Sequence, residues 1–161
     1  MMDASHIGQL RAFFAGGGSL RMLNDTSPEE MDRLWRYGCQ FLQQGKAASA
    51  RNLFQLLVYC DAWNSDYLLS LGVACQLTNA HQDAVVYLIQ AAQILVTDPR
   101  PVSLLARSAA ALQQWESAGE LYQGALTLAN GRAEWRALSA DAHQQLALCR
   151  QQTTQERHHE S

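Results

Sequence analysis

Side chains capable of acid–base chemistry are scattered along this chain of 161 residues. The carboxylates Asp32, Asp66, Glu116 and Glu120 have no histidine paired with them, and His81 stands alone. Acid–base or nucleophilic catalysis needs two or three such groups within hydrogen-bonding reach of one another. The sequence also contains no phosphate-binding or nucleophile-elbow glycine motif. We therefore expect that the protein is not an enzyme.

The residues that most often bind metal ions are also poorly spaced. The cysteines contain no Cys-x-x-Cys pair, and each lies in an apolar helical pattern, where free cysteine behaves as a small hydrophobe. They are Cys39, Cys60, Cys75 and Cys149. His158 and His159 stand in a polar tail without further ligands. We expect no metal site and no cofactor.

The clearest pattern is a repeat. Ala50, Ala84 and Ala118 recur every 34 residues, which is the length of the tetratricopeptide repeat, a pair of antiparallel helices that stacks into a solenoid. Numbered from Met31, Ser65 and Pro99, the repeats also agree at position 4 (Leu34, Leu68, Val102), position 7 (Tyr37, Leu71, Leu105), position 8 (Gly38, Gly72, Ala106), position 24 (Phe54, Leu88, Tyr122) and position 27 (Leu57, Ala91, Ala125). Small residues allow two helices to cross closely, and large ones fill the space between helices. The pattern predicts an all-α, right-handed superhelical solenoid of three repeats.

The repeats divide the chain into four parts. Residues 1–27 are expected to form an N-terminal helix (4–14), a Gly-rich hinge (16–18) and a short apolar piece. Residues 28–130 hold the repeats, at about 31–64, 65–98 and 99–130, and Ser27-Pro28 with Glu30 is a strong helix start. The turns within the repeats are expected at Gly45, around Asn79 and around Gln113. A capping helix follows at 131–151, and the polar tail 152–161 is expected to be disordered.

Charge and hydropathy exclude two classes of partner. The net charge is −3, Lys46 is the single lysine, and no basic stripe alternates with aromatic residues, so nucleic acid is not an expected partner. No apolar run is long enough to span a membrane, and the first residues do not resemble a secretory signal. We expect a cytosolic protein that does not insert into membranes.

A solenoid of this kind presents the first helix of each repeat to a bound polypeptide. Positions 2, 5, 9, 12 and 13 are predicted to face this groove: Asp32, Trp35, Cys39, Leu42 and Gln43; Asp66, Leu69, Val73, Gln76 and Leu77; Arg100, Ser103, Arg107, Ala110 and Ala111. The first two sets form an apolar floor suited to an extended peptide. One alternative is that Trp35 and Leu69 pack against the N-terminal segment instead. A clamp for a terminal carboxylate needs Lys and Asn where this chain has Trp35 and Cys39, so that function is disfavoured.

Three stretches carry a resemblance to a known family, which extends over roughly residues 10–130. They are residues 13–20 (FFAGGGSL), 50–57 (ARNLFQLL) and 61–67 (DAWNSDY), followed by Leu71-Gly72. With the repeat register, they resemble the class II chaperones of bacterial type III secretion systems. The resemblance implies a cytoplasmic chaperone that binds hydrophobic, pore-forming translocator proteins as an extended segment in the groove and keeps them soluble.

The resemblance also implies a homodimer formed through the N-terminal region. Its apolar residues Ile7, Leu10, Phe13, Phe14 and Leu20 are the expected dimer interface. A scaffold or assembly factor with permanent protein partners is the alternative function, and a role in transcriptional co-activation stays open.

Overall fold

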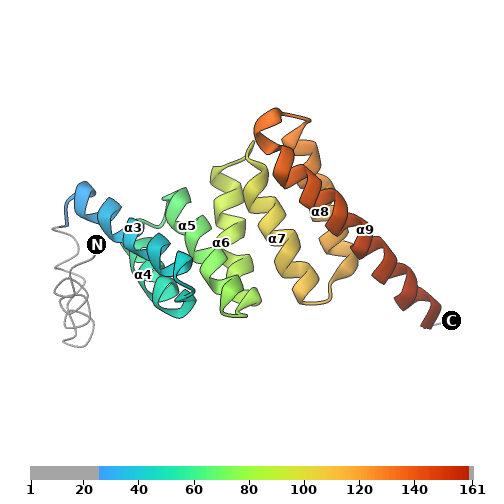
Figure 1. Cartoon of the computed structure of the whole chain (residues 1–161), viewed down its shortest axis with the longest axis horizontal. Helices are drawn as coiled ribbons and strands as arrows, with labels where there is room; N and C mark the ends of the chain where they lie inside the picture. Colours follow the sequence, from blue (N-terminus) through green and yellow to red (C-terminus); the bar gives the residue numbers. More distant parts are fainter. Residues whose placement is uncertain (1–25, 160–161) are drawn as a thin grey trace.

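The computed structural model describes residues 26–159, and within this range the chain is helical without strands. The elements in order are α3 (Pro28–Gln43), α4 (Ala47–Cys60), α5 (Ser65–Leu77), α6 (His81–Ile94), α7 (Pro99–Ala111), α8 (Trp115–Ala129), the short 3₁₀ helix η1 (Ala133–Trp135) and α9 (Arg136–His159). Figure 1 shows α3–α4, α5–α6 and α7–α8 as three successive pairs, which are the three predicted repeats. The predicted N-terminal helix and hinge lie outside the described residues.

The first helix of each repeat begins with a side-chain cap. Ser27 Oγ accepts a hydrogen bond from the Glu30 backbone N–H (3.2 Å), and Glu30 Oε2 accepts one from the Ser27 N–H (2.9 Å). Asn64 and Asp98 cap α5 and α7 in the same way. Such caps satisfy N–H groups that have no partner within the helix. The predicted start of the first repeat is therefore confirmed.

Each repeat turns at its fifteenth residue, through a backbone conformation with positive φ. The φ angle is 73° at Gly45, 58° at Asn79 and 61° at Gln113. Glycine and asparagine adopt this left-handed conformation readily, whereas an ordinary side chain is strained there. The predicted turns are confirmed, although Gln113 gives no signal in its residue type. The second helices of the first two repeats, α4 and α6, both have 14 residues.

Most of the predicted core positions are buried, and Leu34, Tyr37 and Val102 are half-buried. Ala50, Ala84 and Ala118 have no exposed surface, and the large residues at position 24 are at most 2% exposed. A Cβ atom on Gly38 would lie 2.3 Å from Cε1 of Phe54, and one on Gly72 would lie 2.5 Å from Cδ2 of Leu88. Positions 8 and 24 therefore meet where the two helices of a repeat cross, as the register predicts.

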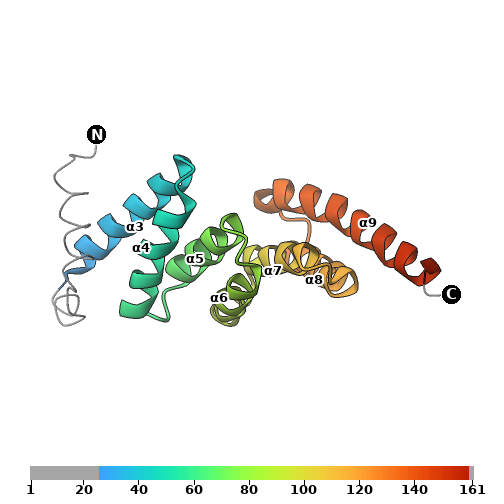
Figure 2. The same ribbon diagram turned by 90° about the horizontal axis from the view of Figure 1, so that it is seen from below.

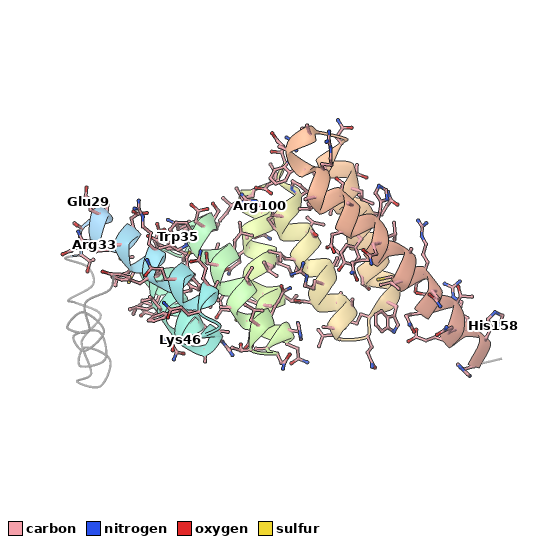
Figure 3. All side chains as sticks on the ribbon, in the orientation of Figure 1. Glu29, Arg33, Trp35, Lys46, Arg100 and His158 are labelled. Carbon is pink, nitrogen blue, oxygen red and sulfur yellow. The ribbon has the colours of Figure 1, made fainter. Side chains whose placement is uncertain are left out.

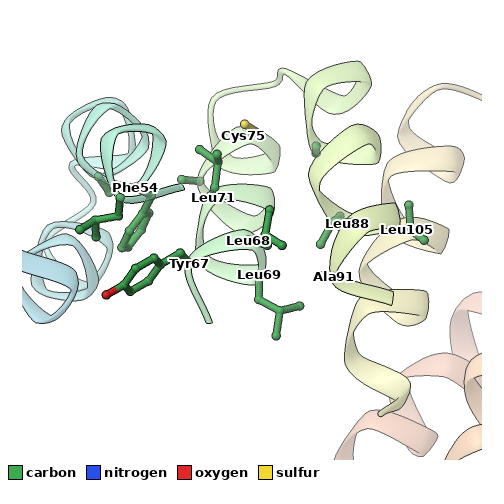
Figure 4. Close-up of a cluster of buried hydrophobic side chains, with 13 residues drawn as sticks. Phe54, Tyr67, Leu68, Leu69, Leu71, Cys75, Leu88, Ala91 and Leu105 are labelled. Carbon is green, nitrogen blue, oxygen red and sulfur yellow. The ribbon is translucent and has the colours of Figure 1, made fainter. Parts of the chain in front are cut away.

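The repeats share one continuous core. Figure 4 shows it from Phe54 in α4, across α5, to Leu105 in α7. Each second helix packs on the first helix of the next repeat, α4 on α5 and α6 on α7, while the first helices also contact one another, α3 with α5 and α5 with α7. The first helices therefore line the inner side of the stack, and Figure 2 shows the pairs following one another along its length.

Helix α9 covers the end of the solenoid. It packs on α8 and α7 as a further first helix would, and it buries Ala142, Leu146 and Cys149, three residues of the predicted face. The expectation of a helix ending at residue 151 and a disordered tail is wrong for residues 152–159, because α9 continues to His159. Its last turns extend beyond α8, and His158 lies at their end (Figure 3). No glycine or proline interrupts this stretch, and adding a residue to a formed helix costs little.

Candidate functional site: the inner groove

Helix α5 has a narrow free face. Its neighbours α3, α4, α6 and α7 surround it and bury most of its side chains. Beyond the first residue of the helix, the side chains left exposed or half-buried are Asp66, Ser70, Val73 and Leu77. Their spacing of four, three and four residues places them on one stripe of a helix. With its other sides covered, this stripe faces the inside of the stack.

The same register recurs on the other two first helices. The stripe occupies positions 2, 6, 9 and 13 of each repeat: Asp32, Arg36, Cys39 and Gln43 on α3; Asp66, Ser70, Val73 and Leu77 on α5; Arg100, Leu104, Arg107 and Ala111 on α7. All of these side chains are exposed or half-buried. We call these residues the inner stripe. It contains the predicted groove residues at positions 2, 9 and 13.

The predicted groove residues at positions 5 and 12 lie beside the inner stripe, between neighbouring first helices. Trp35 Nε1 donates a hydrogen bond to Ser70 Oγ (2.9 Å). Gln76 Nε2 donates to the Leu104 carbonyl oxygen (2.7 Å) and to Ser108 Oγ (2.8 Å). Leu69 is only 8% exposed and belongs to the core. These side chains join one repeat to the next. Leu69 and Gln76 offer a ligand little free surface, whereas Trp35 is half-buried.

Three further predicted residues share these positions. Ser103 is 8% exposed, and Leu42 and Ala110 are half-buried. The assignment of positions 5 and 12 to the free face is therefore corrected. Successive residues turn by about 100° around a helix axis, so positions 5 and 12 lie some 60–80° to one side of position 2.

Position 6 is the part of the groove that sequence reasoning missed. Arg36, Ser70 and Leu104 occupy it. The signal was available, because on a helical projection position 6 lies only about 40° from position 2 and about 20° from position 13. A projection alone, however, does not tell which side of a helix the neighbouring repeat covers.

Several known proteins are similar to this chain in sequence and fold. The model of the tetratricopeptide repeat family matches residues 31–64. The chaperone protein SicA of Salmonella typhimurium is 28% identical over 126 residues, which are 78% of this chain and 74% of SicA. A type III secretion complex from Aeromonas hydrophila contains a chain with a TM-score of 0.77 and 26% identity; the match covers 91% of this chain and 98% of that one. PcrH from Pseudomonas aeruginosa has a TM-score of 0.75 and 26% identity, over 81% and 98% of the two chains. Over most of its length, this chain is similar to the class II chaperones of type III secretion systems.

The groove of this chain carries charges of both signs, and most of them are paired. On α3, Asp32 forms an ion pair with Arg36 of the same stripe (2.8 Å). On α7, hydrogen bonds from the Arg100 side chain to Asp98 raise the pKa of Arg100, and the charge of Asp66 raises it further. Arg107 lies 4.0 Å from Asp141 of α9. Among the described residues of the stripe, Asp66 on α5 is therefore the charge without an ion pair.

One cysteine of the chain, Cys39, lies on the inner stripe. Within residues 26–159, the four cysteines are free. Burial raises the pKa of the Cys39 thiol, and the nearby Asp66 carboxylate raises it further. A neutral thiol is a small apolar group, so Cys39 adds to the apolar part of the inner stripe.

Metal-binding clusters and membrane-spanning helices were both sought in the described part of the chain. Across residues 26–159, no cluster of three or more His, Cys, Asp or Glu side chains has the arrangement of a metal site. Within the same range, no helix combines the length and apolar character needed to cross a bilayer. The predicted dimer residues Ile7, Leu10, Phe13, Phe14 and Leu20 lie outside the described residues.

Proposed function

We propose that this chaperone binds an extended segment of a hydrophobic translocator protein in its inner groove, in the bacterial cytoplasm, and keeps that protein soluble and competent for secretion. The observation that carries the proposal is the inner stripe, because it is continuous over three repeats and apolar in its middle. Val73, Leu77 and Leu104 supply this apolar surface, and Leu77 is 59% exposed. An apolar side chain buried against such a surface contributes about 1.5–3 kcal/mol.

A family relative supports the same occupant. PcrH has been solved in complex with the chaperone binding region of PopB, and that chain has a TM-score of 0.72 and 25% identity to this one. The proposal assigns binding to the groove, as the name of this relative's ligand, a chaperone binding region, suggests.

The first test asks whether a translocator depends on the chaperone. A candidate translocator encoded beside this chain is expressed in a bacterial host with and without the chaperone. We expect the translocator to be soluble and to co-purify only when the chaperone is present. A translocator that aggregates equally in both cases would refute the proposal and favour a scaffold with permanent partners.

The second test locates the binding surface with a matched pair of variants. Leu77→Glu places a charge on the inner stripe, and Val86→Glu places one on the outer face of α6, at a residue of similar exposure (59% and 55%). We expect Leu77→Glu to weaken translocator binding at least tenfold and Val86→Glu to leave it unchanged, with equal helical content by circular dichroism. Equal binding by both variants would place the cargo elsewhere. Leu69 is unsuitable for this test because it is part of the core.

Dimer formation through the N-terminal residues is a separate part of the proposal. Phe13 and Phe14 lie on the apolar face predicted from the sequence. Changing both to Asp is expected to move the protein from dimer to monomer on a calibrated sizing column with light scattering. An unchanged mass would remove this segment from the interface.

A further inference from the structure

A cavity of about 580 Å³ opens beside the inner stripe, between α3, the end of α4 and the start of α5. It is lined by Thr26, Pro28, Met31, Asp32, Trp35, Cys60, Asp61, Asn64, Asp66 and Tyr67. Three of these residues are aspartates, and none carries a positive charge. Asp32 and Asp66 also belong to the inner stripe, so a chain lying on the stripe passes the mouth of the cavity.

The three carboxylates differ in the ion pairs and hydrogen bonds that they form within the protein. Asp32 pairs with Arg36 (2.8 Å) on the solvent-exposed surface of α3. Asp61 accepts hydrogen bonds from the Trp63 backbone N–H (3.4 Å) and from Asn64 Nδ2 (3.5 Å). Within the described residues, the Asp66 carboxylate has no ion pair and no hydrogen bond. The cavity therefore holds more negative charge than its own walls neutralise.

Tyr67 offers a second polar group to the cavity. The residue is only 7% exposed, and within residues 26–159 its hydroxyl makes no hydrogen bond. Figure 4 shows the hydroxyl at the end of the ring farthest from α5. Burial raises the pKa of Tyr67, and the charges of Asp61, Asp32 and Asp66 raise it further. The largely buried ring thus holds in place a hydroxyl that is free to bond a ligand in the cavity.

We propose that this cavity receives the side chain of an arginine or lysine from the bound translocator segment. The inference rests on the proposed function and specifies it: the segment carries a basic residue next to its apolar anchors. Asp66 takes the charge, and Tyr67 and Asn64 offer oxygen atoms as further acceptors. Trp35 supplies an aromatic wall, on which a guanidinium group stacks favourably.

The charge of the groove fixes where this basic residue lies. Arg100 and Arg107 are on α7, and Arg36 offsets Asp32 on α3. The basic side chain is therefore held at Asp66, at the end of the groove formed by α3 and α5. Complementary charge of this kind sets the register of a bound chain and excludes wrong partners. The polarity thus gives the segment a direction as well as a position.

The experiment combines changes on both sides of the interaction. Overlapping 15-residue peptides from the translocator encoded beside this chain are titrated against the full-length chaperone at low salt, and the tightest peptide is remade with each Lys or Arg replaced by Gln. The chaperone variants are Asp66→Asn, which removes the unpaired charge, and Tyr67→Phe, which removes the hydroxyl and keeps the ring. Glu120→Gln, an exposed carboxylate on α8, is the matched control for loss of one negative charge.

We expect Asp66→Asn to raise the Kd of the original peptide about tenfold, as for loss of a hydrogen bond to a charged group, and Tyr67→Phe to raise it about threefold. One Gln-substituted peptide, the one that lacks the basic residue held in the cavity, should already have a raised Kd, and neither variant should raise it further. Added salt should reduce the difference in Kd between the wild type and Asp66→Asn for the original peptide. Equal effects of Asp66→Asn on all peptides, or an equal effect of Glu120→Gln, would overturn the inference while the proposed function stands. Absence of binding by every peptide would overturn both.

One further outcome identifies a different occupant. Arg21 lies five residues before Thr26 in the sequence, within reach of the cavity for an extended chain at roughly 3.3–3.6 Å per residue. If Asp66→Asn and Arg21→Gln each lower the urea midpoint of the free chaperone, and the double variant is no worse than either, the chain's own arginine fills the cavity. That result would refute the assignment to the translocator.

Discussion

At the closest helix crossings of the solenoid, we expect a glycine-to-alanine change to lower the stability, the opposite of what helix propensity predicts. Gly72 lies in the middle of α5, where alanine would normally stabilise a helix by roughly 0.5–1 kcal/mol. Here an added Cβ would lie 2.5 Å from Leu88 Cδ2 and 2.7 Å from Leu88 Cγ. Leu88 is completely buried, so its side chain has no free space into which it can turn. We expect Gly72→Ala to destabilise the protein.

The size of the effect follows from the two opposing contributions. Forcing an additional methyl group into a packed core costs about 1–3 kcal/mol, and the gain in helix propensity offsets up to about 1 kcal/mol of this. The net loss should be about 1–2 kcal/mol. The third repeat already has Ala106 at this position, opposite Tyr122, so the close approach is specific to the first two repeats.

The assay is urea denaturation followed by far-UV circular dichroism. Gly124→Ala is the control, because the nearest atom to its added Cβ would be Val102 Cγ1 at 3.7 Å, an ordinary contact. We expect the urea midpoint to fall for Gly72→Ala and to rise for Gly124→Ala. Equal or higher midpoints for both variants would show that the crossing in solution is looser than the structure describes.

Three further predictions concern the turns, the helix starts and the cargo. Gln113→Gly should raise the stability by about 0.5–1 kcal/mol, because glycine adopts a φ of 61° without strain; an unchanged urea midpoint would contradict it. Burial raises the pKa of Asp98, but hydrogen bonds and charge from Arg100 outweigh this and lower it. Asp98→Asn should therefore be less stable than the wild type at neutral pH, and the difference should disappear as the pH falls below about 4, through the lowered pKa; a difference independent of pH would refute this account. A translocator peptide should bind best with apolar residues about three apart, because an extended chain rises about 3.3 Å per residue and packed helices lie 8–10 Å apart; peptide titration with altered spacing would show no preference if this is wrong.

The fold could be predicted from the sequence because the requirements of each repeat are local. Ala50, Ala84 and Ala118 mark helix crossings, and Gly38 and Gly72 mark the closest of them. Each of these positions is determined by the neighbouring helix of the same repeat, so a period of 34 residues was enough to place it.

The exact free surface could not be predicted in the same way. Whether Leu69 or Ser70 faces the groove depends on the angle at which one repeat sits on the next, which no single repeat encodes. The cavity was even harder to predict. Asp61 reaches it from the junction between two repeats, and Tyr67 reaches it from a position next to the inner stripe. The extension of α9 also makes a tertiary contact that the sequence does not indicate, the solvent-exposed Arg157–Glu116 pair at 3.2 Å.

The two side-chain links between first helices connect the shape of the groove to its ligand. Trp35 is bonded to Ser70, a residue of the inner stripe, and Gln76 is bonded to the Leu104 carbonyl oxygen, on the stripe of the next helix. Both links lie at the border of the surface on which the cargo is proposed to rest. A segment that presses on Ser70 or Leu104 therefore acts on the same contacts that hold neighbouring repeats at their angle. Because each repeat touches only its neighbours, a bound chain that crosses all three repeats adds contacts between repeats that are otherwise not in contact, so binding should stabilise the curvature of the whole solenoid.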